Sequence, residues 1–180
     1  GSFIAQFLSI LFLLLKFRGI SLYLIPVYGL FEYLIFTLIF FKFYSIKWQS
    51  YFRIIALIIS ATLIYEGLSS FYNQDPNSFF SFGKILSSFS IMIYSTIYII
   101  QSIFDKTTNI NSQKIELISI ILIYFSIILI IYVSINYLIN NIEFTAYFWH
   151  LHSFTVILFY SVLTFLLWKH GKNRKFSGSG

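Results

Sequence analysis

The sequence predicts an all-α fold, a polytopic transmembrane helical bundle of about six membrane helices. The chain has 180 residues, of which 58% are hydrophobic and only 10% are charged, whereas a soluble domain carries about 25% charged residues. Several apolar runs reach the roughly 20 residues that a spanning helix needs. They do not alternate in polarity, which excludes the strands of a membrane β-barrel. We expect a single transmembrane domain over residues 3–175 and interpret residues 1–2 and 177–180 as vector-derived.

The predicted spans follow one another with short polar connections. Four runs are long enough by themselves: Ile20–Phe41, Ile85–Phe104, Leu117–Leu138 and Tyr147–Trp168. A further span, Ser50–Phe71, has a shorter apolar centre bounded by Arg53 and Glu66, whose side chains can snorkel toward the lipid headgroups. The first run, Phe3–Leu15, predicts a short or truncated helix.

Basic residues in the short connections predict the orientation of the bundle. Three lie on one side, namely Lys16, Arg18 and Lys84. Nine lie on the other side: Lys42, Lys47, Arg53, Lys106, Lys114, Lys169, Lys172, Arg174 and Lys175. The side with more basic residues is expected to be cytoplasmic, and it includes the C-terminus. The last four of the nine predict a cytoplasmic basic anchor for anionic lipid rather than for nucleic acid, because the patch is short and lacks interleaved aromatic residues.

Polar residues inside the apolar runs are candidate functional residues, because a charge at the centre of a membrane helix costs about 2.5–3.5 kcal/mol. Glu32 lies near the middle of its predicted span, and Tyr28 shares its face one turn earlier. Lys84 begins the fourth span and is the natural partner of Glu32. The Glu32 carboxylate either fixes helix packing or contacts a ligand or ion, and both interpretations stay open.

Lys84 also starts a stripe of polar residues on one helix face. The stripe continues with Ser88, Ser95 and Ser102 at steps of four and seven residues. This pattern favours a helix–helix seam of small residues. The lining of a pore or of a binding site is the alternative.

Two histidines, His150 and His152, lie near the predicted outer end of the last span. Residues two positions apart on a helix face opposite ways, whereas a helical metal pair needs a spacing of three or four, so no metal or other cofactor is predicted. We expect His150 and Ser153 to face the bundle and His152 to lie on another side.

A polar pocket that opens outward is predicted from seven residues: Tyr28, Glu32, Lys84, Ser88, His150, His152 and Ser153.

Four stretches carry a resemblance to a known family: Gly19-Ile20 through Tyr28-Gly29-Leu30-Phe31-Glu32-Tyr33, then Ser81-Phe82-Gly83-Lys84, Ile121-Leu122-Ile123-Tyr124-Phe125-Ser126 and His152-Ser153. In order and spacing they resemble uncharacterised six- to seven-helix inner-membrane proteins of Bacteroidetes, especially flavobacteria. The resemblance implies a bacterial inner-membrane location, one further N-terminal helix and no established activity. The family usually has Arg where Lys84 stands and Glu where Ser87 stands, so its presumed ion pair is altered here.

Three classes of function fit these features. The first, which we predict, is a membrane sensor or small-ligand-binding module that signals to a cytoplasmic partner. The second is a transporter subunit, which predicts a helix broken at residues 26–29. The third is an oligomeric pore or membrane effector, such as an accessory protein of a bacterial defence system, with the serine stripe facing a symmetry axis.

An enzyme is not predicted, because the sequence has no HExxH or GxSxG motif. The expected partners are the lipid bilayer and a second copy or a cytoplasmic protein, with no nucleic acid.

Overall fold

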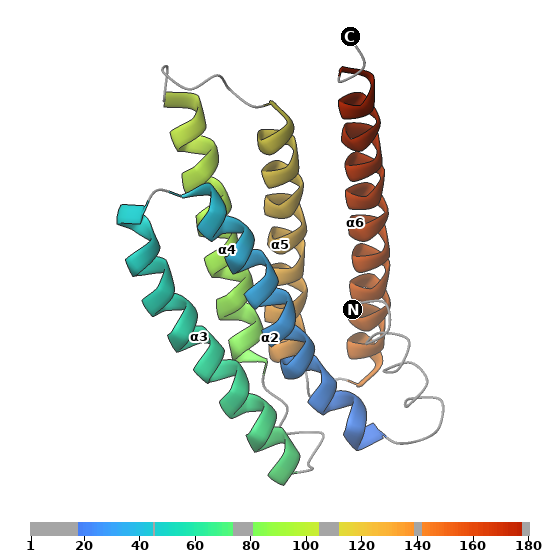
Figure 1. Ribbon diagram of the computed structural model, residues 1–180. Helices are drawn as coiled ribbons and strands as arrows, with labels where there is room; N and C mark the ends of the chain where they lie inside the picture. The colour runs from blue at the N-terminus through green and yellow to red at the C-terminus, as the bar shows by residue number, and fades with distance from the viewer. Residues whose placement is uncertain (1–17, 45, 74–80, 105–111, 139–141, 178–180) are drawn as a thin grey trace.

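The computed structural model describes residues 18–44, 46–73, 81–104, 112–138 and 142–177. These residues form five helices in an up-and-down arrangement (Figure 1). Their bounds are α2 Arg18–Phe43, α3 Ile46–Asn73, α4 Phe82–Phe104, α5 Ser112–Leu138 and α6 Ile142–Ser177. All five are long and apolar enough to cross a membrane. The predicted all-α membrane bundle is therefore confirmed, while the predicted helix over Phe3–Leu15 lies outside the described residues.

The helices are longer than the apolar runs that predicted them. α4 has 23 residues and α6 has 36, which correspond to lengths of roughly 35 and 54 Å at 1.5 Å per residue. The hydrocarbon core of a bilayer is about 30 Å thick. The ends of the helices therefore extend past the hydrocarbon, where polar residues such as Lys169 can continue the helix in the headgroup region.

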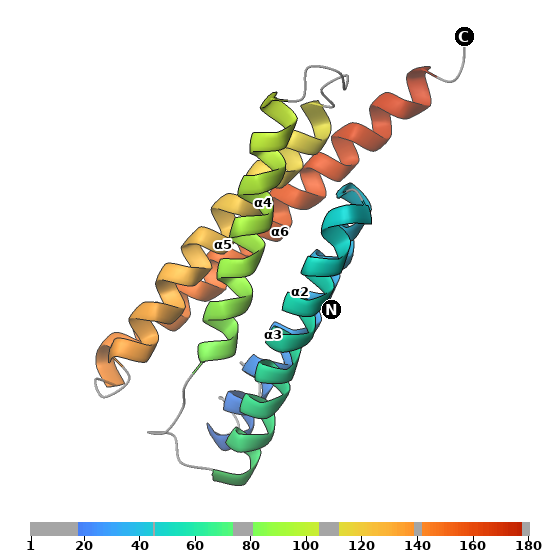
Figure 2. The ribbon, with the colours of Figure 1, turned by 90° about the vertical axis from the view of Figure 1, so that its left-hand side faces the viewer.

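Neighbouring helices form two units that meet along a shared interface. α2 and α3 pack as a hairpin, and α4, α5 and α6 pack in sequence as a layer (Figure 2). The hairpin meets the layer mainly through contacts of α2 and α3 with α4. The carboxyl ends of α2, α4 and α6 lie at the same end of the bundle (Figure 1), which we call the C-terminal end.

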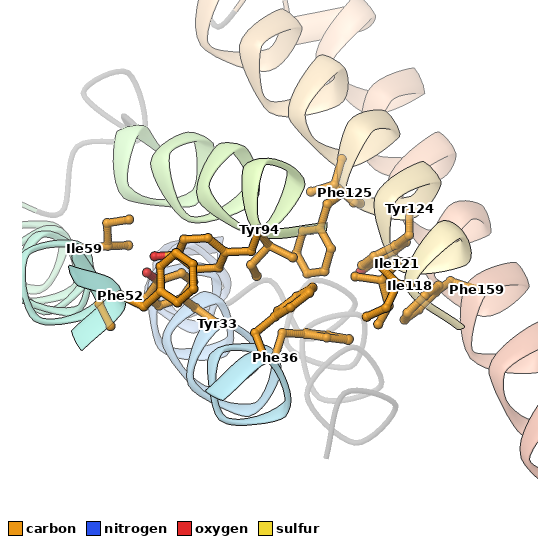
Figure 3. Packing of buried hydrophobic residues seen from close by; sticks show 14 of the residues in the cluster. Tyr33, Phe36, Phe52, Ile59, Tyr94, Ile118, Ile121, Tyr124, Phe125 and Phe159 are labelled. Carbon is orange, nitrogen blue, oxygen red and sulfur yellow. The ribbon is translucent and has the colours of Figure 1, made fainter. Parts of the chain in front are cut away.

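Aromatic side chains fill the interior, while large apolar side chains also cover the outside. The ring of Phe36 on α2 meets Phe125 on α5 edge-on, with centroids 5.0 Å apart, and Tyr124 stacks on Phe159 of α6 at 3.9 Å (Figure 3). On the outside, Leu57 is 71% exposed. In water such a surface would be unfavourable, so the arrangement fits a bundle surrounded by lipid.

The N-terminus of α4 is held by polar groups from both neighbouring helices. Glu66 of α3 accepts a hydrogen bond from the Gly83 backbone N–H at 2.6 Å. Asn136 of α5 accepts from the backbone N–H of Ser81 at 3.2 Å and from its hydroxyl at 3.1 Å. The first N–H groups of a helix have no partner within the helix, so in lipid they need such acceptors. A carboxylate there also complements the helix dipole.

Gly83 is required at this junction because there is no room for a side chain. A Cβ at this position would lie 2.9 Å from both Glu66 Oε2 and Leu63 Cδ2. We predict that Gly83→Ala lowers the free energy of unfolding by about 1–3 kcal/mol through overpacking, measured by reversible unfolding in lipid–detergent micelles. Gly67→Ala is the matched control, since its Cβ would meet only Pro26 Cβ at 3.7 Å. Equal effects of the two substitutions would contradict the steric explanation.

Candidate functional site

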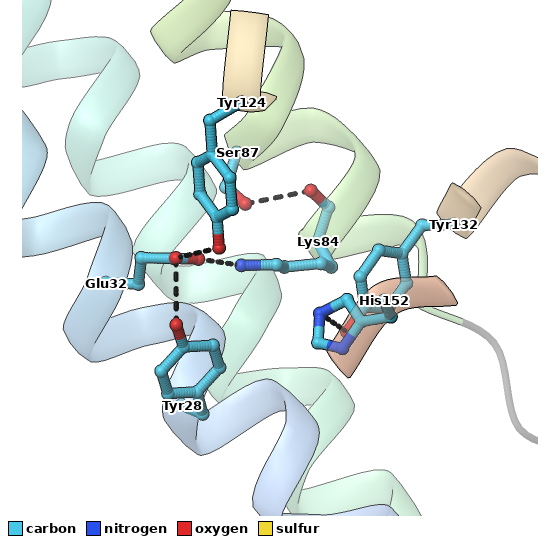
Figure 4. A network of polar contacts seen from close by, with 7 residues as sticks. All are labelled: Tyr28, Glu32, Lys84, Ser87, Tyr124, Tyr132 and His152. Atoms are coloured by element: carbon cyan, nitrogen blue, oxygen red, sulfur yellow. Dashed lines mark hydrogen bonds and ion pairs between the residues drawn. The ribbon is translucent and has the colours of Figure 1, made fainter. Parts of the chain in front are cut away.

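A buried ion pair joins the hairpin to the layer. The Lys84 Nζ atom of α4 contacts the Glu32 Oε2 atom of α2 (Figure 4). Glu32 is 3% exposed and Lys84 is 1% exposed. An ionised carboxylate or ammonium in lipid is strongly unfavourable unless it is paired. The partnership of these two residues that the sequence predicts is therefore found in the structure.

Lys84 reaches Glu32 because α2 has no side chain in its path. A Cβ at Gly29 would lie 3.2 Å from Lys84 Cδ, so glycine at this position leaves space for the lysine stem. The Lys84 Nζ atom also lies 5.2 Å from the ring centroid of Tyr28 and 6.0 Å from that of Tyr132. Ring faces attract a cation at such distances. The ammonium group is thus surrounded by one carboxylate and two aromatic rings.

The second oxygen of Glu32 accepts hydrogen bonds from two tyrosines. Tyr28 Oη donates to Glu32 Oε1 at 2.9 Å, and Tyr124 Oη of α5 donates to the same atom at 2.8 Å (Figure 4). Glu32 therefore holds groups from α2, α4 and α5 together. Hydrogen bonds to an ionised group are stronger than those between neutral groups. Chemically, the arrangement is a buried carboxyl group surrounded by three donors.

The structure reverses the predicted orientation of the two histidines. His152 is buried, 6% exposed, whereas His150 is exposed and Ser153 is half-buried. The prediction that His150 faces the bundle was wrong because it followed the polar stripe of α6. The bulky residues Val156 and Phe159 instead determine which face packs inward, and both are buried. In lipid, van der Waals packing between helices contributes to helix association together with polar contacts, so a polar stripe alone does not determine the rotation of a helix.

His152 belongs to the same polar region as the ion pair. Its Nε2 atom lies 3.5 Å from Tyr132 Oη, and the two rings meet edge-on with centroids 5.4 Å apart (Figure 4). Tyr132 in turn faces Lys84. No group of three His, Asp or Glu side chains in the described residues is placed to hold a metal ion.

Ser88 lies inside the bundle, on the same face as Lys84. Ser88 and Ser95 are both fully buried, and Ser102 is half-buried. The Ser95 hydroxyl donates to the Ile91 carbonyl oxygen at 2.8 Å. The serine stripe therefore faces other helices of the same chain, as a seam of small residues does.

A groove opens on the side of the bundle between α2 and α6, with α5 at its base. Its volume is about 810 Å³. Its walls are mainly apolar, and Glu32 is the charged residue that lines it. The other lining residues include Ile35 and Ile39 of α2, Leu117 of α5, and Tyr160, Ser161 and Leu167 of α6. We call this feature the lateral groove.

The lateral groove extends from Glu32 toward the C-terminal end of the bundle. This direction is opposite to the side on which the sequence predicts a polar pocket. The physical reason is bulk, because Lys84, Tyr132 and His152 fill the space between the helices on the other side of Glu32 (Figure 4). Of the seven predicted pocket residues, only Glu32 lines the groove. Tyr28 and Lys84 contact Glu32 directly.

Among the residues whose side chains the structure describes, four basic residues lie near the C-terminal end: Lys42, Arg53, Lys114 and Lys169. Lys169 makes an exposed ion pair with Glu116 at 3.7 Å, which contributes little to stability. The helix α6 continues through Lys172, Arg174 and Lys175. The side chains of these three predicted anchor residues lie outside the described part of the structure.

Two residues of the site were not singled out by the sequence. Tyr124 and Tyr132 lie among many apolar residues in α5, where a tyrosine gives no separate signal. Their spacing of eight residues places them on one helix face, and this spacing is the signal in the sequence that links them.

The comparisons with known proteins return no relative. No protein-family model, no curated protein and no solved structure matches the chain. The resemblance to inner-membrane proteins of Bacteroidetes therefore stays a prediction.

Proposed function

We propose that the protein is a membrane sensor that binds a small amphiphilic molecule entering the lateral groove from the lipid. The observation that carries this proposal is the groove itself. Its volume of about 810 Å³ lies within the range of roughly 300–1,000 Å³ common for ligand sites. Apolar walls with one convergent polar group are typical of such sites, and here that group is Glu32.

The chemistry of the walls determines the class of ligand. The apolar residues favour a hydrocarbon chain. Two hydroxyls on the α6 wall are already bonded to their own helix, because Ser161 donates to the Ile157 carbonyl oxygen and Thr164 donates to that of Tyr160. The Glu32 carboxylate is already balanced by Lys84. The fitting ligand is therefore a chain with a neutral head that donates a hydrogen bond, such as a long-chain alcohol.

Binding at Glu32 offers a way to change the arrangement of the helices. The same carboxylate lines the groove and ties the hairpin to the layer through Lys84 and Tyr124. A head group that hydrogen-bonds to Glu32 competes with these partners, and so favours one arrangement of the two units over another. The basic C-terminal end, which we propose to be cytoplasmic, would pass this change to a protein partner in the bacterial cytoplasm.

Two observations make the alternative functions less well supported. The transporter hypothesis predicts a broken helix at residues 26–29, but α2 continues through Pro26. The pore hypothesis predicts that the serine stripe faces a symmetry axis between chains, but Ser88 and Ser95 are buried within one chain.

A photoreactive long-chain alcohol tests the proposal in nanodiscs. We predict that it labels α2 and α6 and that Ser161→Trp, which fills the groove, lowers this labelling several-fold. Thr96→Trp is the matched control, because Thr96 is also exposed and also donates to its own helix, at 2.9 Å to the Met92 carbonyl oxygen. Labelling spread evenly over all exposed helices, or equal in the two variants, would contradict the proposal. Glu32→Gln is a less direct test, since it also removes the counter-ion of Lys84.

A further inference from the structure

Several hydroxyl groups in the interior lack a direct hydrogen-bond partner within the described part of the chain. They are Tyr33 Oη and Thr37 Oγ1 on α2, and Ser88 Oγ and Tyr94 Oη on α4. The residues are at most 2% exposed. Lipid supplies no hydrogen bonds, and an unpaired buried polar group is unfavourable. Such groups in a native protein therefore require an explanation.

Three of these hydroxyls gather where α2 meets α4. The side chains of Tyr33 and Tyr94 come from opposite helices and point the same way, toward α3 between Phe52 and Ile59 (Figure 3). The Tyr33 hydroxyl lies within interaction range of the hydroxyls of Tyr94, Thr37 and Ser90, yet Tyr33, Thr37 and Tyr94 make no hydrogen bond of normal geometry. The three hydroxyls thus lie close together, but none of them has a partner in good hydrogen-bond geometry. We call Tyr33, Thr37 and Tyr94 the hydroxyl cluster.

We propose that the hydroxyl cluster binds internal water, as a single molecule or a small group. A buried water needs two to four polar partners, and the cluster supplies three hydroxyls that can both donate and accept. The three groups are neutral, which favours water over a metal cation.

The hydroxyl cluster lies on the interface between the hairpin and the layer, separate from the lateral groove. None of its three residues lines that groove. Nearer the C-terminal end, the Tyr44 hydroxyl donates to the Tyr94 carbonyl oxygen at 2.5 Å. Water at this place would let α2 move against α4 while each hydroxyl keeps a partner. The inference does not depend on the ligand proposed for the groove.

X-ray radiolysis of the protein in nanodiscs tests for bound water directly, because hydroxyl radicals formed from internal water oxidise the adjacent side chains. We predict that Tyr33 and Tyr94 are oxidised several-fold faster than Tyr132. The comparison is matched, since Tyr33 and Tyr132 are each 1% exposed and Tyr94 is 2% exposed. Equal rates for the three tyrosines would overturn the proposal.

A substitution distinguishes bridging water from unpaired hydroxyls by the sign of its effect. If water bridges the cluster, Tyr33→Phe lowers the unfolding midpoint by about 2–4 °C, the scale of one lost hydrogen bond in a chain of this size. Under the same assumption, Tyr33→Phe also slows oxidation of Tyr94, because the bridging water is lost. A direct hydrogen bond between the two tyrosines predicts no such change in the oxidation of Tyr94. If the hydroxyl is unpaired, removing it raises the midpoint, and this result would overturn the proposal. Tyr137→Phe, at a side chain 87% exposed, is the control and should leave both values unchanged.

Discussion

Replacing Lys84 with Met is expected to lower the free energy of unfolding by about 3–5 kcal/mol, the range for breaking a buried ion pair by removal of one partner. The reason is the carboxylate that stays behind. Glu32 is 3% exposed, and without Lys84 it keeps only the two tyrosine donors, Tyr28 and Tyr124. Met has a similar length and fills the space beside Gly29 that the lysine stem occupies, so the loss of packing is small. Reversible unfolding in lipid–detergent micelles measures the effect.

Lys42→Met is the matched control for this experiment. Lys42 is an exposed residue in the last turn of α2, so its replacement removes the same charge without leaving a buried partner. We expect a change within about 0.5 kcal/mol, as for most surface substitutions. If Lys84→Met were as mild as Lys42→Met, the ion pair would have no structural importance.

The second large effect is expected for Tyr124→Phe, which should lower the free energy of unfolding by about 1.5–3 kcal/mol, the range for a hydrogen bond to a charged group. Tyr124 is 3% exposed and donates to Glu32 at 2.8 Å. Phe keeps the ring that stacks on Phe159 at 3.9 Å. The substitution therefore removes the hydrogen bond and leaves the packing of α5 against α6 in place.

Comparison with Tyr28→Phe makes this second experiment specific. Both tyrosines donate to the same oxygen of Glu32, but Tyr28 is only half-buried and belongs to the same helix as Glu32. We expect the smaller loss for Tyr28→Phe, because its hydrogen bond does not join separate helices. A larger loss for Tyr28→Phe than for Tyr124→Phe would contradict the assigned role of Tyr124 between α2 and α5.

The fold was predictable because the length of an apolar run is a direct physical signal. Each predicted span in the described chain corresponds to one helix, including α3, whose apolar centre is bounded by Arg53 and Glu66. The helix ends were less predictable. α6 continues to Ser177, well past the predicted end at Trp168, because charged residues such as Lys169 are compatible with a helix outside the hydrocarbon.

The candidate site was predictable only in part. A carboxylate in the middle of an apolar run requires a partner, and Lys84 was the cation within reach, so this pair followed from the sequence. The rotation of α6 did not, because its polar stripe pointed to His150 while the packing of Val156 and Phe159 buries His152. The lateral groove depends on how far α2 and α6 stand apart, and no single residue encodes that distance.

The central claim is that Glu32 and Lys84 act as one buried pair that joins two parts of a membrane bundle. A double-mutant cycle of Glu32→Leu, Lys84→Met and both together, with unfolding measured in a lipid bilayer, tests it most directly. We predict that each single substitution is strongly destabilising and that the double variant regains most of the loss, because no unpaired charge remains and apolar replacements of a buried pair are well tolerated. Additive losses in the double variant, which mean no coupling between the two positions, would contradict the claim.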